Sequence, residues 1–254
     1  MHVTIIGIGP GHPDQITVQA VNALNAHDVI LLPTKAGTTT GDTRRSIAQR
    51  HLVNPDAHRL IDLPMPSVRN RPRGAYRHSV QQFREQQAAA IAAALDALDV
   101  TNVAILTWGC PTLFDGTIEG VRTYPGVQMD VIPGVTSVSA LAAAHGVAQT
   151  EIGQSVLITT GRQLQHGLPA NHGTVVDMVD AKGHVWTQDP AGWTAYWGAF
   201  VGLAQEELDH GPLDEMQQRI PAKRAELAET HGWLFDVTLL RQDHQDQNPP
   251  EPDI

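Results

Sequence analysis

The 254-residue chain has a single cysteine, few aromatic residues and fewer basic than acidic residues. Its lone cysteine, Cys110, excludes an intrachain disulfide and a zinc site built from cysteines, and it is typical of the reducing cytosol. The formal net charge of −10 argues against a nucleic-acid-binding surface. The sequence contains neither a run of 18 apolar residues nor a basic leader followed by an apolar segment. We therefore expect a cytoplasmic protein without a membrane partner.

Three turns punctuated by glycine or proline are the most informative features that the sequence does contain. They lie at residues 7–11, 108–111 and 131–137, and each follows a short apolar run. In an open α/β sheet, the loops that leave the carboxyl ends of the strands line the ligand crevice. Glycine at such places lets the backbone approach a ligand closely. The three turns together therefore predict one small-molecule site.

Apolar runs and amphipathic periodicity alternate along most of the chain, which is typical of an α/β fold with a parallel-rich sheet. Strands are expected over residues 2–8, 29–32, 58–63, 103–106, 127–132, 155–159, 174–179, 195–201 and 233–240. Five helices are expected. The first begins at about residue 15, and the second is capped by Asp42 or Thr43 and ends at about residue 52. The other three cover residues 76–98, about 136 to Gly146, and 213–230. Pro221 is expected to kink or split the last of these helices.

The predicted domain boundary falls at Pro133 and Gly134. It divides the chain into two α/β domains, residues 1–132 and 133–241, with the ligand cleft between them. Residues 242–254 carry three prolines and four acidic residues and are expected to form a disordered tail.

Several common catalytic motifs are absent from the sequence. The first glycine turn has His12 where a dinucleotide fingerprint needs its third glycine, and Pro13 blocks the start of a helix there. No phosphate-binding NTPase loop or G-x-S-x-G elbow occurs, and no histidine spacing predicts a metal site. Cys110 has no neighbouring His or Lys that would activate it, so we interpret it as a small buried residue in a turn rather than a reactive thiol. These exclusions leave a site lined largely by backbone.

In their order and spacing, the three turns resemble the tetrapyrrole (corrin and porphyrin) methylase family. The family's G-x-G-P-G-D-P-x-x-L-T, G-D-P and V-x-P-G-[IV]-[TS]-S patterns correspond here to residues 7–17, 109–111 and 131–137. Residues 158–162, 195–200 and 224–241 resemble the deacetylating branch of the family. That resemblance implies a homodimeric methyltransferase of cobalamin biosynthesis. It would use S-adenosyl-L-methionine to methylate precorrin-5 at C-1, releasing acetate, precorrin-6A and S-adenosyl-L-homocysteine.

The resemblance also implies the residues of the site. The implied cofactor contacts are Pro10, Trp108, Gly109, Cys110, Leu113, Thr136, Ser137, Met178 and Gly198, of which the last two rest on strand pattern alone. Three loop residues are candidates for the base that activates water for acetate release: Asp115, His12 and Asp42. For each residue the alternative is an ordinary role in a turn, a core or a solvated loop. His12 and Cys110 stand where the family usually has aspartate, which puts substrate handling and one polar cofactor contact in doubt.

A precorrin carries many carboxylates, so an acidic protein needs a local basic lining to bind one. The candidates are Lys35, Arg44, Arg45, Arg69, Arg71, Arg73, Arg77 and Arg162, and the alternative is a set of solvated side chains. Two other functions remain open. One is a methylase of the same fold that acts on another corrin carbon, a siroheme precursor, diphthine or ribosomal RNA. The other is a non-catalytic cofactor-binding relative.

Overall fold

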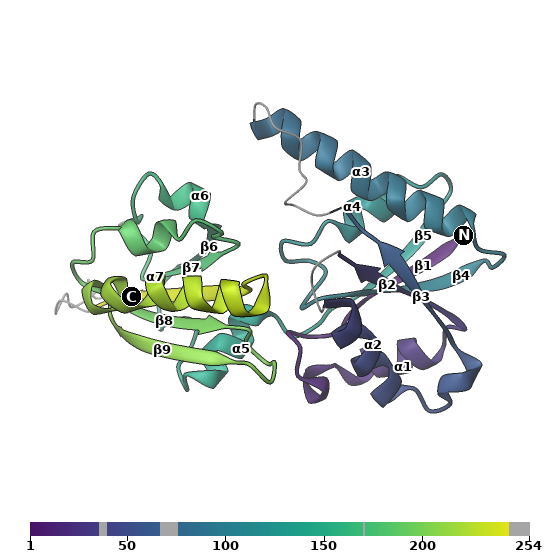
Figure 1. The fold of residues 1–254 in the computed structure, drawn as a ribbon, viewed down its shortest axis with the longest axis horizontal. Coiled ribbons are helices and arrows are strands. Elements are labelled where there is room, and N and C mark those ends of the chain that lie inside the picture. Colours follow the sequence, from purple (N-terminus) through teal and green to yellow (C-terminus); the bar gives the residue numbers. More distant parts are fainter. Residues whose placement is uncertain (36–39, 67–75, 170, 244–254) are drawn as a thin grey trace, which may run out of the picture. The chain divides into compact units, whose positions relative to one another are not determined.

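The structure is a computed structural model that describes residues 1–35, 40–66, 76–169 and 171–243. The chain divides into two compact units, residues 1–137 and 138–254, and each unit contains a five-stranded sheet (Figure 1). The predicted α/β fold class is confirmed. β10 reaches Gln242, and most of the predicted tail lies outside the described residues.

The sheet of the first unit is parallel throughout. Its strands are β1 (His2–Gly7), β2 (Val29–Thr34), β3 (Arg59–Pro64), β4 (Asn102–Thr107) and β5 (Gln128–Ile132), in the order β3-β2-β4-β1-β5. The register places Ile5 of β1 opposite Ile105 of β4 and Val131 of β5. Because all five strands run the same way, their carboxyl ends lie at one edge of the sheet.

Helices cover both faces of this sheet, as Figure 1 shows for α1 and α2 on one side and α3 and α4 on the other. Their bounds are α1 (Val18–Asn25), α2 (Thr40–His51), α3 (Tyr76–Asp96) and α4 (Thr117–Arg122), with short 3-10 turns at Pro13–Gln15 and Pro55–Ala57. Successive strand residues point to opposite faces. Ile6 therefore packs in one apolar core with Leu24 of α1, while Ile5 packs in the other with Ile91 of α3.

The sheet of the second unit is mixed. Its strands are β6 (Val156–Thr160), β7 (Thr174–Met178), β8 (Trp193–Ala199), β9 (Glu207–Pro212) and β10 (Asp236–Gln242), in the order β6-β7-β10-β8-β9. Only the β6–β7 pair is parallel. The helices are α5 (Ser137–Ala144), α6 (Gly161–Leu164) and α7 (Leu213–His231), with a 3-10 turn at His184–Thr187. The core gathers around the fully buried Trp197.

Several predicted element boundaries are wrong for identifiable reasons. α1 begins at Val18 rather than near residue 15, because the Thr17 hydroxyl accepts the Ala20 N–H and caps the helix there. Asp42 and Thr43 do not cap α2, which begins at Thr40 and holds both of them in its first turn.

The structure also differs from the sequence pattern further along the chain. α7 continues through Pro221 as one helix. Pro221 is exposed, so water can reach the carbonyl that the proline leaves without a partner. The sequence pattern missed α4 and β9 altogether. Within the described ranges, every helix is too short or too polar to cross a membrane.

A polar network lies inside the second unit, against α7. Arg224 of α7 donates from Nε to Asp236 Oδ2 at 2.6 Å, and the indole N–H of Trp197 donates to the same oxygen at 3.0 Å. Asp180 accepts from the Val185 N–H at 3.0 Å and pairs with His184 Nδ1 at 2.9 Å. Asp177 is only 2% exposed and forms a side-chain hydrogen bond with Asp180.

Asp177 and Asp180 have pKa values that are shifted in opposite directions. Burial, together with the charges of Asp180 and Asp236, raises the pKa of Asp177 to about 9 against the opposing charge of Arg224. Burial also disfavours the Asp180 carboxylate, but hydrogen bonds from Val185, His184 and Asp177 outweigh it and lower the pKa of Asp180. At neutral pH, Asp177 is therefore a neutral acid that donates its proton to the Asp180 carboxylate.

We predict that Asp177→Asn stabilises the protein by an amount that grows with pH. The unfolded state releases the Asp177 proton near pH 4, whereas the folded state keeps it to about pH 9. The wild type therefore loses stability across this range, and asparagine, which still donates to Asp180, does not titrate. Thermal unfolding should show little difference near pH 4.5 and a variant midpoint about 5 °C higher at pH 8. A pH-independent difference would contradict the assignment.

Candidate functional site

The three sequence turns meet at the carboxyl edge of the first sheet. β4, β1 and β5 are neighbours in the sheet, so the segments that follow them emerge side by side. An antiparallel bridge joins the first two turns: the Gly9 N–H donates to the Gly109 carbonyl at 3.2 Å, and the Gly109 N–H donates to the Gly9 carbonyl at 2.9 Å. The Ile8 N–H also donates to the Thr107 carbonyl, at 3.1 Å.

Glycine is required in these turns because the backbones approach so closely. A Cβ atom on Gly7 would lie 2.6 Å from the Gly134 nitrogen and 2.8 Å from the Gly109 carbonyl oxygen. A Cβ atom on Gly134 would collide with that same oxygen. Gly109 has a φ of +63°, in the left-handed region that favours glycine. A Cβ atom on Gly109 would meet no atom nearer than the Val135 carbonyl oxygen, at 4.0 Å, so the backbone angle rather than crowding favours glycine there.

Cys110 connects the second turn to the third. Its sulfur lies 3.0 Å from the Thr112 hydroxyl, and the side chain is 7% exposed. Burial favours the neutral thiol, but hydrogen bonds from the Thr112 hydroxyl and the Thr112 and Gly134 backbones outweigh it and lower the pKa of Cys110. The sequence suggested no activating neighbour, and the structure supplies hydrogen-bond donors rather than a cation. Cys110 thus makes a polar contact to the third turn. It does so at a position where the family pattern has aspartate.

Buried positive charge lies beside the turns. Arg44 of α2 donates from Nη1 to the Pro33 carbonyl at 2.8 Å, and its guanidinium carbon is 5.6 Å from the centroid of the Trp108 ring. Burial lowers the pKa of Arg44 to about 10, and burial together with Arg44 lowers the pKa of Lys35. Asp115 is the carboxylate that opposes both shifts.

The three candidate bases lie in different surroundings. Asp115 accepts the Thr117 N–H at 2.7 Å at the start of α4, and its charge acts on Cys110, Lys35 and Arg44. His12 is exposed and accepts the Asp14 N–H at 3.1 Å, which caps a 3-10 turn. Asp42 is exposed in the first turn of α2. Of the three, Asp115 is the one that the structure brings to the charged groups beside the turns.

The remaining basic candidates have other surroundings. Arg45 pairs with Asp62 at 2.7 Å, and Arg162 is exposed in α6. Arg69, Arg71 and Arg73 lie outside the described residues, as does the side chain of Arg77.

The cofactor contacts expected in the first unit gather at the same edge of its sheet. Pro10 is buried beside the Gly9–Gly109 bridge, and Leu113 donates its N–H to the Cys110 carbonyl at 3.1 Å. Thr136 and Ser137 are half-buried where the third turn leads into α5.

In the second unit, Met178 and Gly198 lie on one line across the sheet. Both pair with Val237 of β10, Met178 from β7 and Gly198 from β8. Directly paired residues point to the same face of an antiparallel ladder. A Cβ atom on Gly198 would lie 2.6 Å from the end of the Leu141 side chain of α5, so a larger residue there would make neighbouring core side chains shift.

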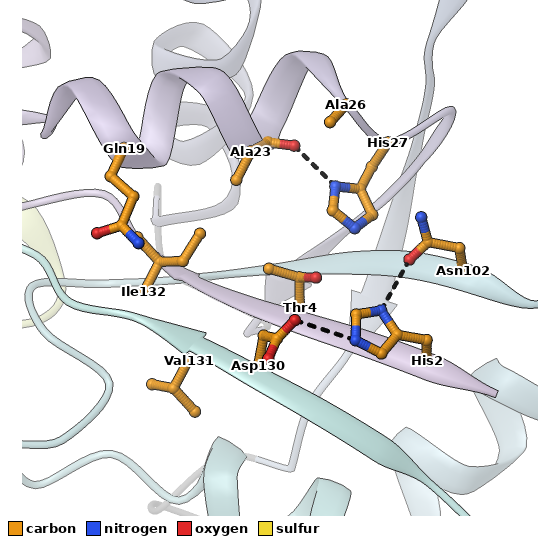
Figure 2. Close-up of a pocket in the computed structure, with 10 residues that line it drawn as sticks. All are labelled: His2, Thr4, Gln19, Ala23, Ala26, His27, Asn102, Asp130, Val131 and Ile132. Carbon is orange, nitrogen blue, oxygen red and sulfur yellow. Dashed lines mark hydrogen bonds and ion pairs between the residues drawn. The ribbon is translucent and has the colours of Figure 1, made fainter.

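A separate cavity of about 400 Å³ lies against α1, and the sequence analysis did not anticipate it (Figure 2). Its lining includes His2 and Asn102, the first residues of β1 and β4, at the opposite edge from the glycine turns. His2 pairs with Asp130 at 3.1 Å. His27 Nδ1 donates to the Ala23 carbonyl at 2.7 Å, and among the described residues its buried Nε2 has no hydrogen-bond partner. His2 is half-buried, and Asn102 and Asp130 are exposed.

The comparisons with known proteins agree with this architecture. Residues 2–216 match the protein family described as Tetrapyrrole (Corrin/Porphyrin) Methylases, and the chain belongs to that family. A Sinorhizobium protein described as precorrin-6A synthase [deacetylating] is 36% identical over 94% of this chain and 95% of its own length. A Sinorhizobium precorrin-2 C(20)-methyltransferase is 33% identical over 56% of this chain and 57% of its own.

Solved structures show the same fold. The crystal structure of a cobalamin synthesis related protein (CobF) from Corynebacterium diphtheriae has a TM-score of 0.80 and 26% identity, covering 96% of this chain and all of its own. A uroporphyrin-III C-methyltransferase from Thermus thermophilus, crystallised with S-adenosylhomocysteine, has a TM-score of 0.56 and 19% identity, covering 95% of this chain and 97% of its own. The second likeness concerns the fold alone.

We predict that Gly134→Ala destabilises the protein by about 3 kcal/mol, because its methyl group would collide with the rigid Gly109 backbone. Gly116→Ala is the matched control, since a Cβ there meets mainly the flexible end of the Gln87 side chain. We expect the control to cost about 1 kcal/mol or less. Urea unfolding measures both. Equal costs would show that the three turns do not depend on this close approach.

Proposed function

We propose that this protein is an S-adenosylmethionine-dependent C-methyltransferase that converts precorrin-5 to precorrin-6A, with methylation at C-1 and release of acetate. The observation that carries the proposal is the 36% identity to precorrin-6A synthase over nearly the full length of both chains. The relative described as acting at C-20 of precorrin-2 aligns over only about half of either chain. The match therefore favours the deacetylating reaction over methylation at another corrin carbon.

The glycine turns fit a nucleoside cofactor. Gly9 and Gly109 hold each other by two backbone hydrogen bonds, and a Cβ position on Gly109 is uncrowded. A rigid turn with an uncovered backbone can offer N–H and C=O groups to a ligand at little cost in ordering entropy. S-adenosylmethionine supplies a methyl group already activated on a sulfonium, so the protein mainly has to position donor and acceptor carbon. Pro10, Trp108, Gly109, Cys110, Leu113, Thr136, Ser137, Met178 and Gly198 remain the proposed contacts.

Arg44 and Lys35 fit an anionic substrate. Arg44 is buried beside Trp108, Lys35 is half-buried, and Asp115 is the carboxylate whose charge opposes their pKa shifts. A cation that is shielded from water binds a carboxylate more strongly than a solvated one. We therefore assign these two residues, rather than the ion-paired Arg45, to a carboxylate of the precorrin.

Asp115 is the base that we assign to water activation. Hydrolysis of the acetyl group needs a proton acceptor for the attacking water, and the bond that breaks joins the acetyl carbon to the macrocycle. The electron pair left on the ring can then feed the attack of C-1 on the methyl group. Asp115 lies within the charged cluster beside the turns, whereas His12 and Asp42 are exposed in local structural roles.

A non-catalytic cofactor-binding relative is the second candidate, motivated by His12 and Cys110. The Cys110 contact to Gly134 joins the second and third turns, which supports the catalytic candidate over this one. We also propose that the protein is cytoplasmic and that it forms a homodimer. Light scattering of the purified protein would test the homodimer.

We predict that the purified protein converts precorrin-5 and methyl-labelled S-adenosylmethionine to precorrin-6A. Mass spectrometry should show one labelled methyl group gained and the acetyl group lost, with one acetate released for each methyl transferred. Cofactor binding without a methylated product would support the non-catalytic candidate instead. Methylation without acetate would place the enzyme at another carbon.

We predict that Asp115→Asn lowers the rate of acetate release about 100-fold, the usual size of a general-base contribution. Asparagine caps a helix about as well as aspartate, so the start of α4 should persist. Binding of S-adenosylhomocysteine, measured by calorimetry, should stay within about twofold of the wild type. His12→Ala and Asp42→Asn are matched controls with expected wild-type rates. If either control loses acetate release while Asp115→Asn retains it, the assignment to Asp115 is wrong.

A further inference from the structure

Three non-glycine residues in the described ranges have a left-handed backbone: Phe114, Val179 and Phe200, with φ of 51°, 59° and 52°. This region is unfavourable for side chains with a Cβ, and most of all for β-branched or bulky ones. Strain of this kind persists only where the surrounding structure imposes it, and it concentrates at functional sites. Each of the three residues therefore needs a physical account.

Phe200 has such an account in its packing. It is 4% exposed, its ring packs edge to face against His231 at a centroid distance of 5.0 Å, and its N–H donates to the Phe235 carbonyl at 2.7 Å. Burial of a large aromatic side chain offsets the backbone strain. The fold therefore explains why phenylalanine occupies this position.

Val179 has no such packing. Its side chain is 67% exposed, although valine is apolar and β-branched. Both of its neighbours are held in place: Met178 pairs with Thr160 and with Val237, and Asp180 accepts from Val185 and pairs with His184. The short chain path between these two anchored residues accounts for the left-handed backbone. It does not account for valine, because glycine would adopt the same φ without strain.

The position of Val179 points to a ligand. It directly follows Met178, the last residue of β7, which lies in line with Gly198 on one face of the second sheet. An isopropyl group beyond the edge of the sheet offers only apolar contact, which suits the face of a macrocycle better than its carboxylate-bearing periphery or the polar ends of a nucleoside. Phe114 of the first unit also has a left-handed backbone, and 53% of this residue is exposed. It directly follows Leu113.

We infer that Val179 is a specificity-determining contact to the apolar face of the macrocycle of the tetrapyrrole substrate. The inference rests on the proposed function and deepens it. The strained backbone aims the side chain away from the core, and the substrate covers the isopropyl group when it binds. Valine is retained at this position for recognition, at the expense of stability.

Variants at this position separate recognition from folding. Val179→Gly removes both the strain and the apolar contact, Val179→Asn places a polar side chain that tolerates the left-handed region, and Val179→Ile keeps the apolar contact. Ile152→Asn is the matched control, because Ile152 is a fully exposed aliphatic residue of the same unit outside the left-handed set. We expect Val179→Gly and Val179→Asn to raise the KM for precorrin-5 about 10-fold. Val179→Ile and Ile152→Asn should remain within about twofold of the wild type.

Two further measurements make the outcome decisive. The thermal midpoint of Val179→Gly should equal or exceed that of the wild type, and a fall of more than about 2 °C would show that valine serves the fold. Calorimetry should give an unchanged Kd for S-adenosylhomocysteine, and weaker binding would assign Val179 to the cofactor instead. An unchanged KM in both Val179→Gly and Val179→Asn would also overturn the inference. If the wild type itself fails to turn over precorrin-5, the proposed function fails, and a fluorescence titration of precorrin-5 still tests the contact.

Discussion

The close packing of bare backbone at the carboxyl edge of the first sheet is the constraint on which the candidate site depends. The Gly109 carbonyl oxygen occupies the space that a side chain on Gly7 or Gly134 would need. Strand order makes this possible, because β1 lies between β4 and β5 and all three run parallel. The resulting cluster of turns is held close together by its own backbone, which reduces the ordering entropy that binding to main-chain groups would cost.

The two units bury charge in opposite ways. In the first, burial lowers the pKa of Arg44 and of Lys35, and the charge of Asp115 opposes both shifts. In the second, Asp177 avoids an unpaired charge by remaining protonated and donating to Asp180, beneath α7. Buried charge is costly unless it is paired or neutralised. The first arrangement therefore suits binding, whereas the second belongs to the core.

The departures from the family pattern are less disruptive than the residue types suggest. Cys110 replaces an aspartate, yet its sulfur accepts hydrogen bonds from the Thr112 hydroxyl and the Gly134 backbone. His12 replaces the other aspartate and acts as the cap of a 3-10 turn. Both residues preserve the turns that they occupy. The geometry of the three turns thus depends on the glycines more than on the two replaced carboxylates.

The sequence by itself determined the α/β class, most of the strands and the family, because apolar periodicity and glycine punctuation are local signals. It did not determine the start of α2, the antiparallel β9 and β10 or the continuity of α7 through Pro221, which depend on partners distant in the chain. Only the tertiary structure brought Asp115 to Arg44 and Lys35, and only it showed the strain at Val179. Charge coupling and backbone strain are properties of a folded environment, and local residue patterns do not encode them.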